Sequence, residues 1–164
     1  MRFVFVLLLH VIILPGVSFA GSIYESPVTR ISDGDTFSIR HQGNIFKIRV
    51  FGIDCPEMGQ TYGEEAKAFA QRILPIGQAV KWEYLYTDRF KRVVAIVYLS
   101  DGSTLQEALI QEGLAWVYER YCDRPICEDW RSMESQARAK GAGLWLRADS
   151  IPPWEWRKSK RGQR

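Results

Sequence analysis

Hydrophobic and polar residues alternate along several short stretches of the chain, and this pattern predicts β-strands. The clearest case is 45–51, where Ile48 and Val50 fall on one face of an extended segment and Lys47 and Arg49 on the other. Weaker alternation predicts four further strands, at 28–32, 37–40, 80–86 and 93–99. Turns rich in Gly, Asp and Asn separate the first three strands, so these strands are expected to form a meander.

Apolar residues spaced three and four apart predict helices between and after these strands. The first predicted helix covers 64–74 and the third covers 128–140. The second begins with the Thr104–Glu107 capping-box signature and stops at Gly113. The stretches 114–118 and 152–156 are expected to be extended. Five strands with a helix between the third and fourth predict an α+β fold, a five-stranded OB-type β-barrel with about three α-helices. An α+β sandwich is the alternative.

Both ends of the chain differ from the central part. Arg2 precedes an apolar run at 3–14, and the Ser-Phe-Ala sequence that ends at Ala20 is typical of a signal-peptidase site. We therefore predict that 1–20 is a cleaved signal peptide and the protein is secreted or periplasmic, with an uncleaved anchor as the alternative. The segment 157–164 contains five Lys or Arg residues and is predicted to be a basic tail that adds affinity for phosphates, not chemistry.

The composition is that of a single globular domain. The chain has 164 residues, of which 46% are hydrophobic and 25% charged, and its formal charge of +3 permits a polyanionic partner. After removal of the signal peptide, His41 is the only histidine. This excludes a two-histidine ribonuclease mechanism and a paired His-Lys phosphodiesterase motif, so a carboxylate is the remaining general base for cleaving a phosphate ester.

Three cysteines allow three pairings. Cys122 and Cys127 are separated by four residues, and in an exported protein a local disulfide is the favoured interpretation. Cys55 would then remain a buried thiol. A zinc site would need more ligands than this pair, and His41 is the only histidine of the mature chain.

The candidate chemistry follows the strand at 45–51. Pro56 stiffens a turn that holds Asp54 and Glu57 near the end of the strand that carries Arg49. Two acids and an arginine suit phosphate-ester hydrolysis, because they supply ligands for a hard cation, a base for water and a planar cation for the phosphate. Taken alone, the same residues also fit a solvated acidic turn.

Several motifs together give the chain a family resemblance. They are Asp-Gly-Asp-Thr at 33–36, Arg49, Ile-Asp-Cys-Pro-Glu at 53–57, Asp-Arg-Phe-Lys-Arg at 88–92, Tyr-Gly-Glu-Glu-Ala at 62–66, Gln-Glu-Ala-Leu at 106–109 and Gly-Leu-Ala at 113–115. In order and in strand context they resemble the staphylococcal nuclease (thermonuclease) family, over about 28–145. The nuclease-like domain is accordingly expected to cover 21–156.

The resemblance implies Ca²⁺ as the cofactor. Asp35 and Asp54 would supply carboxylate ligands, and the backbone carbonyl of Cys55 a third oxygen. Glu57 matches the family's general base. Ca²⁺ prefers hard oxygen ligands and tolerates loose geometry, so this set is chemically suitable.

The resemblance also implies which residues hold the substrate. Arg49 and Arg92 match the two arginines on the scissile phosphate, and Arg89, Phe90 and Tyr121 match groups that hold the terminal phosphate and the base. Guanidinium forks suit the charge that develops on the phosphate. Arg49, Glu57 and Arg92 are expected to converge on one pocket with the two aspartates at its floor. Lys91 stands where the family commonly has glycine, so a positive φ there would be strained.

The function implied is an exported, Ca²⁺-dependent endonuclease that hydrolyses DNA and RNA with little sequence specificity and leaves 3′-phosphates. The partners are then the nucleic-acid substrates alone, with no stable membrane association after cleavage, and the chain is expected to be a monomer. The alternative is a nuclease-like module that binds nucleic acid without cutting it, as OB barrels often do. The presence of all five acids and arginines of the motif favours the enzyme.

Overall fold

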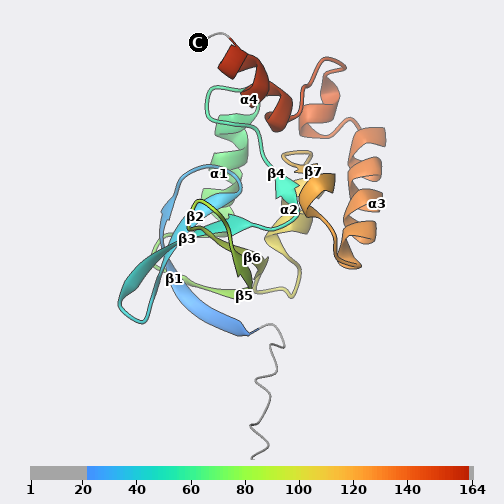
Figure 1. Ribbon diagram of the computed structural model, residues 1–164. Helices are drawn as coiled ribbons and strands as arrows, with labels where there is room; N and C mark the ends of the chain where they lie inside the picture. The colour runs from blue at the N-terminus through green and yellow to red at the C-terminus, as the bar shows by residue number, and fades with distance from the viewer. Residues whose placement is uncertain (1–21, 163–164) are drawn as a thin grey trace, which may run out of the picture.

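A computed structural model describes residues 22–162, and its centre is a β-barrel flanked by helices (Figure 1). The strands are β1 (Ile23–Ile31), β2 (Thr36–His41), β3 (Asn44–Val50), β4 (Ile53–Asp54), β5 (Ala79–Thr87), β6 (Val93–Tyr98) and β7 (Trp116–Val117). The helices are α1 (Gly63–Ile73), α2 (Leu105–Gln111), α3 (Ile126–Ala139) and α4 (Pro153–Gly162), with short 3₁₀ turns η1 (Glu119–Tyr121) and η2 (Gly143–Leu146).

Five strands close the barrel in the order β1-β2-β3-β6-β5, which confirms the predicted OB-type architecture. All neighbours are antiparallel except β3 and β6, which run parallel and close the ring. Arg49 of β3 lies opposite Thr36 on one side and Val94 on the other. This register brings the turn before β2 and the loop before β6 to the part of β3 that carries Arg49.

The alternation that predicted the strands also defines the core. Ile39, Ile48 and Val50 are buried in the barrel, and Leu109 of α2 and Trp130 of α3 belong to the same hydrophobic cluster. Helices and barrel therefore share one core, as expected for a single domain.

One buried polar side chain connects α2 to the barrel. Gln106 is fully buried; its amide nitrogen donates to the carbonyls of Phe51 and Ala95, and its amide oxygen accepts from the backbone nitrogen of Val97. A buried amide without partners would be costly, so these bonds fix where the helix sits. The Thr104–Glu107 capping box is present at the start of α2, as predicted.

The end of the chain differs from the prediction. The segment 152–156 was expected to be extended and 157–164 to be a tail, but Pro153–Gly162 forms α4, a fourth helix. Proline at the first helical position favours a helix start, because its φ is already helical and its missing N–H would have no partner there. The third helix also begins earlier than predicted, at Ile126.

The predicted signal peptide at 1–20 lies outside the described residues. Within 22–162, no helix is long and apolar enough to cross a membrane.

Candidate active site

Two buried aspartates form the floor of the candidate site. Asp35 is 5% and Asp54 1% exposed, although they come from the turn before β2 and from the end of β4. The Asp35 carboxylate accepts hydrogen bonds from the backbone nitrogen of Cys55, at 2.7 Å, and from the Thr36 hydroxyl, at 2.9 Å. The backbone of the predicted acidic turn is thus tied to the side chain of the other acid.

Arg49 bridges the two aspartates. Its Nη1 lies 2.7 Å from Asp35 Oδ2, and its Nη2 lies 2.7 Å from Asp54 Oδ1. Burial disfavours a charged guanidinium, but the two carboxylates outweigh this and raise the pKa of Arg49. The arginine stays cationic, and it compensates the charges that burial would otherwise make costly.

Burial also perturbs the acids. It raises the pKa of Asp54 to about 6, with Arg49 opposing the rise and Asp35 adding to it. Burial and the charge of Asp35 likewise raise the pKa of Asp33, which lies two residues before Asp35, to about 7. Carboxylates held this close together disfavour one another's ionised form, and a bound divalent cation would relieve that.

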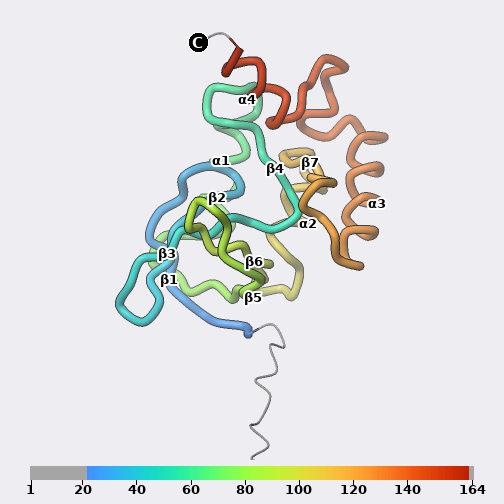
Figure 2. The backbone as a smooth tube through the Cα atoms, viewed as in Figure 1, coloured from blue at the N-terminus to red at the C-terminus, as the bar shows by residue number. Residues whose placement is uncertain are grey.

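Glu57 lies at the rim of the site, with 35% of its side chain exposed. Its backbone nitrogen donates to Gln60 Oε1, and its carboxylate accepts from Arg157 Nη1. Arg157 belongs to α4, which crosses the connection between β4 and α1 (Figure 2). It also donates to both carboxylate oxygens of Asp54, with Nη2 at 2.7 Å from Oδ2 and Nη1 at 3.3 Å from Oδ1.

Arg157 belongs to this cluster although the sequence interpretation did not select it. It was counted as part of a basic tail, but the structure makes it an ordered partner of a predicted metal ligand and of the predicted base. The available signal was the proline at the start of α4, which predicts a helix, although no local pattern indicates where that helix docks.

Arg92 does not contact the two aspartates. Its Nε and Nη2 lie 2.8 and 2.7 Å from Asp88 Oδ2, in the loop before β6. The backbone nitrogens of Phe90 and Arg92 donate to Asp88 Oδ1, so one aspartate organises the loop. Lys91 has φ +61°, a left-handed conformation that favours glycine.

The three predicted substrate-binding residues, Arg89, Phe90 and Tyr121, are all exposed. Phe90 is 63% exposed, with the guanidinium of Arg89 over its ring at 4.7 Å and that of Arg92 at 5.3 Å. Tyr121 is 46% exposed and packs edge-on against Tyr118. These residues do not contact the acid cluster, and their roles stay predictions.

The acid cluster is not a complete metal site made of side chains. Between residues 22 and 162, no three His, Cys, Asp or Glu side chains converge to hold an ion. The thiol of Cys55 is buried, so only its carbonyl suits the predicted role. The donors that are present fit Ca²⁺, which takes two carboxylates and completes its shell with carbonyl, water and phosphate oxygens.

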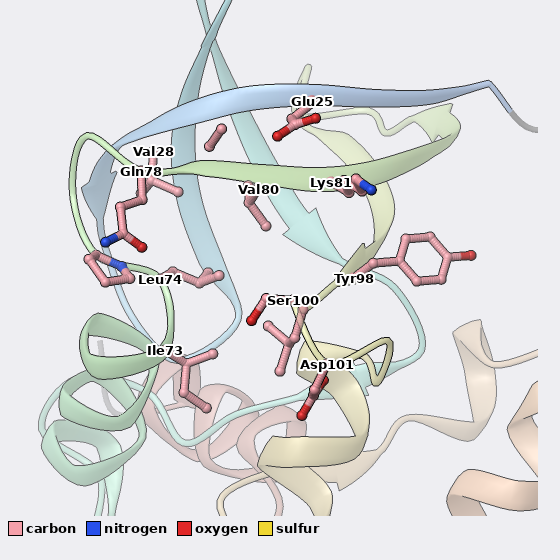
Figure 3. A pocket seen from close by; sticks show the side chains of 13 residues that line it. Glu25, Val28, Ile73, Leu74, Gln78, Val80, Lys81, Tyr98, Ser100 and Asp101 are labelled. Carbon is pink, nitrogen blue, oxygen red and sulfur yellow. The ribbon is translucent and has the colours of Figure 1, made fainter.

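A cavity bordered by other residues lies away from the acid cluster. A cavity of about 530 Å³ is bordered by Glu25 of β1, Lys81 of β5, Tyr98 of β6 and Asp101 (Figure 3). None of the nine predicted site residues lines it. The acid cluster, not this cavity, therefore carries the candidate chemistry.

The fold and the cluster define an α+β protein with an OB-type barrel and two buried aspartates bridged by arginine beside a glutamate. Residues 47–147 match the family model described as "Staphylococcal nuclease homologue". The chain belongs to the staphylococcal nuclease family.

Individual relatives agree. The chain is 35% identical to an "Uncharacterized endonuclease" of Escherichia coli, over 81% of this chain and 84% of the relative. It is 32% identical to a "Micrococcal nuclease" of Shigella flexneri, over 83% of this chain and 82% of the relative. A staphylococcal-like nuclease of Arabidopsis thaliana is 39% identical over 71% of this chain but only 35% of its own length.

Proposed function

We propose that the protein is an exported, Ca²⁺-dependent endonuclease that hydrolyses DNA and RNA with little sequence specificity. The single observation that carries the proposal is the Asp35–Arg49–Asp54 cluster, with Glu57 three residues further along the chain. Family membership and the names of the relatives support cleavage of nucleic acid. The disulfide Cys122–Cys127 supports export, because such bonds persist in oxidising compartments.

In this mechanism Asp35, Asp54 and the Cys55 carbonyl would hold the ion. Bound Ca²⁺ would neutralise phosphate charge and help to orient water. Glu57 accepts the proton of the attacking water at a carboxylate oxygen. Its position at the exposed rim suits this role, because water and substrate can reach it there.

The arginines bind the phosphate. Arg49 would donate to phosphate oxygens, since its guanidinium lies between the two carboxylates that would hold the ion. In Arg92, Asp88 binds Nε and Nη2, so the guanidinium is already oriented and Nη1 remains available to substrate. Attack on phosphorus with departure of the 5′ oxygen leaves the 3′-phosphate ends that the family resemblance implies.

The first test is digestion of supercoiled plasmid and of a structureless RNA by metal-free protein. We expect cleavage of both with added CaCl₂, none with excess chelator, and 3′-phosphate ends by end-group labelling. Retarded migration of nucleic acid without cleavage in saturating Ca²⁺ would instead support a non-catalytic binding module.

A further inference from the structure

Helix α4 contacts the acid cluster through Arg157. Arg157 reaches Asp54 and Glu57, which lie 103 and 100 residues earlier in the chain. The helix carries other cations, Lys158, Lys160 and Arg161, but these are exposed and form no ion pair in the described chain. The residue that turns inward is paired with one predicted metal ligand and with the predicted base.

Other contacts hold α4 in this position. Trp154 stacks on Tyr118, with ring centroids 4.6 Å apart and planes 10° from parallel. Gln60, in the connection that carries Glu57, donates to the carbonyl of Ile151 at 2.8 Å. Because aromatic stacking and this hydrogen bond already dock the helix, the Arg157 contacts are not needed merely to attach it.

Both carboxylates that Arg157 contacts are affected by its positive charge. Asp54 is already paired with Arg49 through Oδ1, and Arg157 adds a second guanidinium on both of its oxygens. Two arginines therefore make three hydrogen bonds to Asp54, and an ionised carboxylate offers only about four lone-pair sites. Glu57 has no other side-chain partner in the described chain, so Arg157 alone restrains its carboxylate.

We infer that Arg157 is a positioning residue of the proposed nuclease site: it holds the Glu57 carboxylate and competes with the divalent cation for Asp54. With an ion held at Asp54, Arg157 would still be able to donate from Nη1 to Glu57. Arg157 thus weakens metal binding while it orients the base. The inference rests on the proposed function for the identity of the ion and of the base.

Ca²⁺ affinity tests the competition without relying on activity. Metal-free wild type, Arg157→Gln and Arg157→Lys are titrated with CaCl₂ by calorimetry in the absence of nucleic acid. Arg157→Gln removes a cation beside the ion, and we expect its dissociation constant to fall about 3- to 10-fold. Arg157→Lys keeps the charge and should stay within about twofold of wild type.

Lys158→Gln is the matched control, because it removes the same charge one residue further along α4 from an exposed side chain. Its Ca²⁺ dissociation constant should equal that of wild type. If Arg157 only stabilised the structure, Arg157→Gln would raise the Ca²⁺ dissociation constant, because a loosened α4 would disorder the carboxylates and weaken Ca²⁺ binding. Unchanged or weaker Ca²⁺ binding by Arg157→Gln would overturn the inference.

The positioning role is tested at saturating Ca²⁺ and substrate. Arg157→Gln should lower kcat about tenfold or more, with partial recovery in Arg157→Lys. In a Glu57→Gln background the same substitution should cost nothing further, because the group that it orients has gone. An equal loss in both backgrounds would overturn the positioning role.

Failure of the inference and failure of the proposed function give different results. If the wild-type protein binds no Ca²⁺, both the proposed function and the inference about Arg157 are wrong. Wild-type protein that binds Ca²⁺ and cleaves, with no tightening in Arg157→Gln, would remove the inference alone.

Discussion

Asp54 and Glu57 are both acids of the same short turn, but their surroundings separate them. Asp54 is 1% exposed and receives two guanidiniums, whereas the side chain of Glu57 is 35% exposed and has one. A buried carboxylate with paired charges suits a ligand, and a rim carboxylate with access to water suits a base.

Glu57→Gln tests this division of roles. Glutamine keeps the size of the side chain and can accept a hydrogen bond, but it cannot take a proton from water. We expect cleavage in saturating Ca²⁺ to fall by about 10²- to 10⁴-fold, with little change in Ca²⁺ affinity. Asp54→Asn should first raise the Ca²⁺ concentration needed for half-maximal rate.

Plasmid cleavage rates across a Ca²⁺ series measure both effects. Glu64→Gln, an exposed acid at the start of α1, is the control for loss of one negative charge. A Glu57→Gln variant that cleaves at nearly the wild-type rate would show that another group is the base.

Lys91 adopts φ +61° in the loop before β6. A left-handed conformation costs a residue with a Cβ about 1–2 kcal/mol, and a glycine loses about 0.4–1 kcal/mol more backbone entropy on folding. Lys91→Gly should therefore raise the free energy of unfolding by up to about 1 kcal/mol, measured in urea. Lys91→Ala removes the charge but keeps the Cβ, so a similar gain in that variant would attribute the effect to charge.

Tyr98 predicts a pH dependence at high pH. Burial, together with the hydrogen bond to Glu83 and its charge, raises the pKa of Tyr98 from 10.0 to about 12. As the pH rises, the Tyr98 hydroxyl ionises in the unfolded chain before it does so in the folded protein. The stabilisation from protonated Tyr98 is therefore fully present below pH 10 and is lost as the pH rises toward 12. Absorbance at 295 nm should include a phenol that titrates near pH 12, and Tyr98→Phe should remove that component and reduce the loss of stability with rising pH.

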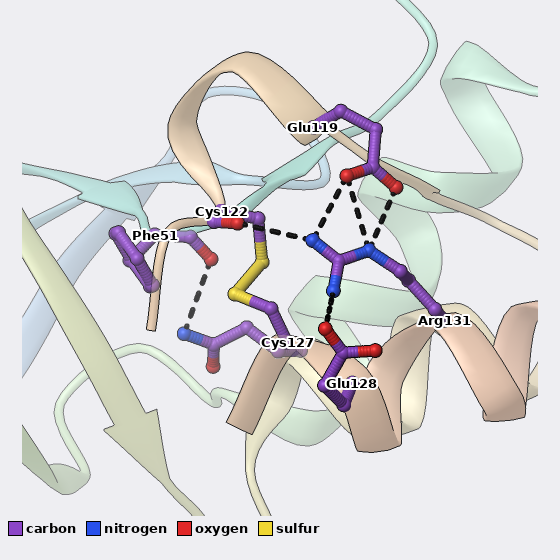
Figure 4. The surroundings of a disulfide bond; sticks show 7 residues. Phe51, Glu119, Cys122, Cys127, Glu128 and Arg131 are labelled. Atoms are coloured by element: carbon purple, nitrogen blue, oxygen red, sulfur yellow. Dashed lines mark hydrogen bonds and ion pairs between the residues drawn. A yellow bond between two sulfur atoms is a disulfide. The ribbon is translucent and has the colours of Figure 1, made fainter. Parts of the chain in front are cut away.

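The disulfide between Cys122 and Cys127 joins the end of η1 to the start of α3, as predicted (Figure 4). Arg131 of α3 strengthens the same junction, because its guanidinium pairs with Glu119 and Glu128 and donates to the carbonyl of Cys122. The ion pairs of Arg131 are exposed and contribute little stability, so the disulfide should contribute most of the stability of this junction.

Replacing both cysteines by alanine should lower the free energy of unfolding by about 2 kcal/mol, the loop entropy expected for so short a ring. Urea unfolding with and without reductant measures this. Reductant should have no effect on the double-alanine variant. Two free thiols in the mass spectrum of unreduced wild type would show that the pair does not form in solution.

The exposed face of α4 gives the molecule a basic end next to the site. Lys158, Lys160 and Arg161 are all exposed there. Contacts of such cations with phosphate release counterions, and each contributes slightly less than one unit to the slope of log affinity against log salt.

Lys160→Gln/Arg161→Gln should reduce that slope by up to about 2 and weaken binding at low salt, with single-turnover cleavage nearly unchanged. Fluorescence anisotropy with labelled DNA over a salt series measures the slope. Equal losses at low and high salt would mean that these residues stabilise α4 instead.

The sequence by itself predicted the barrel and favoured the cysteine pair that the structure contains, and it selected Asp35, Arg49, Asp54 and Glu57 as candidates. Alternation along β3 placed Ile48 in the core and Arg49 on the opposite face, because side-chain direction in a strand follows from position alone. The cysteine pair was predictable because its members are close in the chain.

Only the tertiary structure decided which charges meet. Asp88, not the acid cluster, holds Arg92, and Arg157 reaches Asp54 across 103 residues. The helix that carries Arg157 was predictable from Pro153, but its docking was not. The physical reason is that hydrogen bonding and helix geometry act within a few residues, whereas the partner of a buried charge depends on which surfaces pack together once the core has formed.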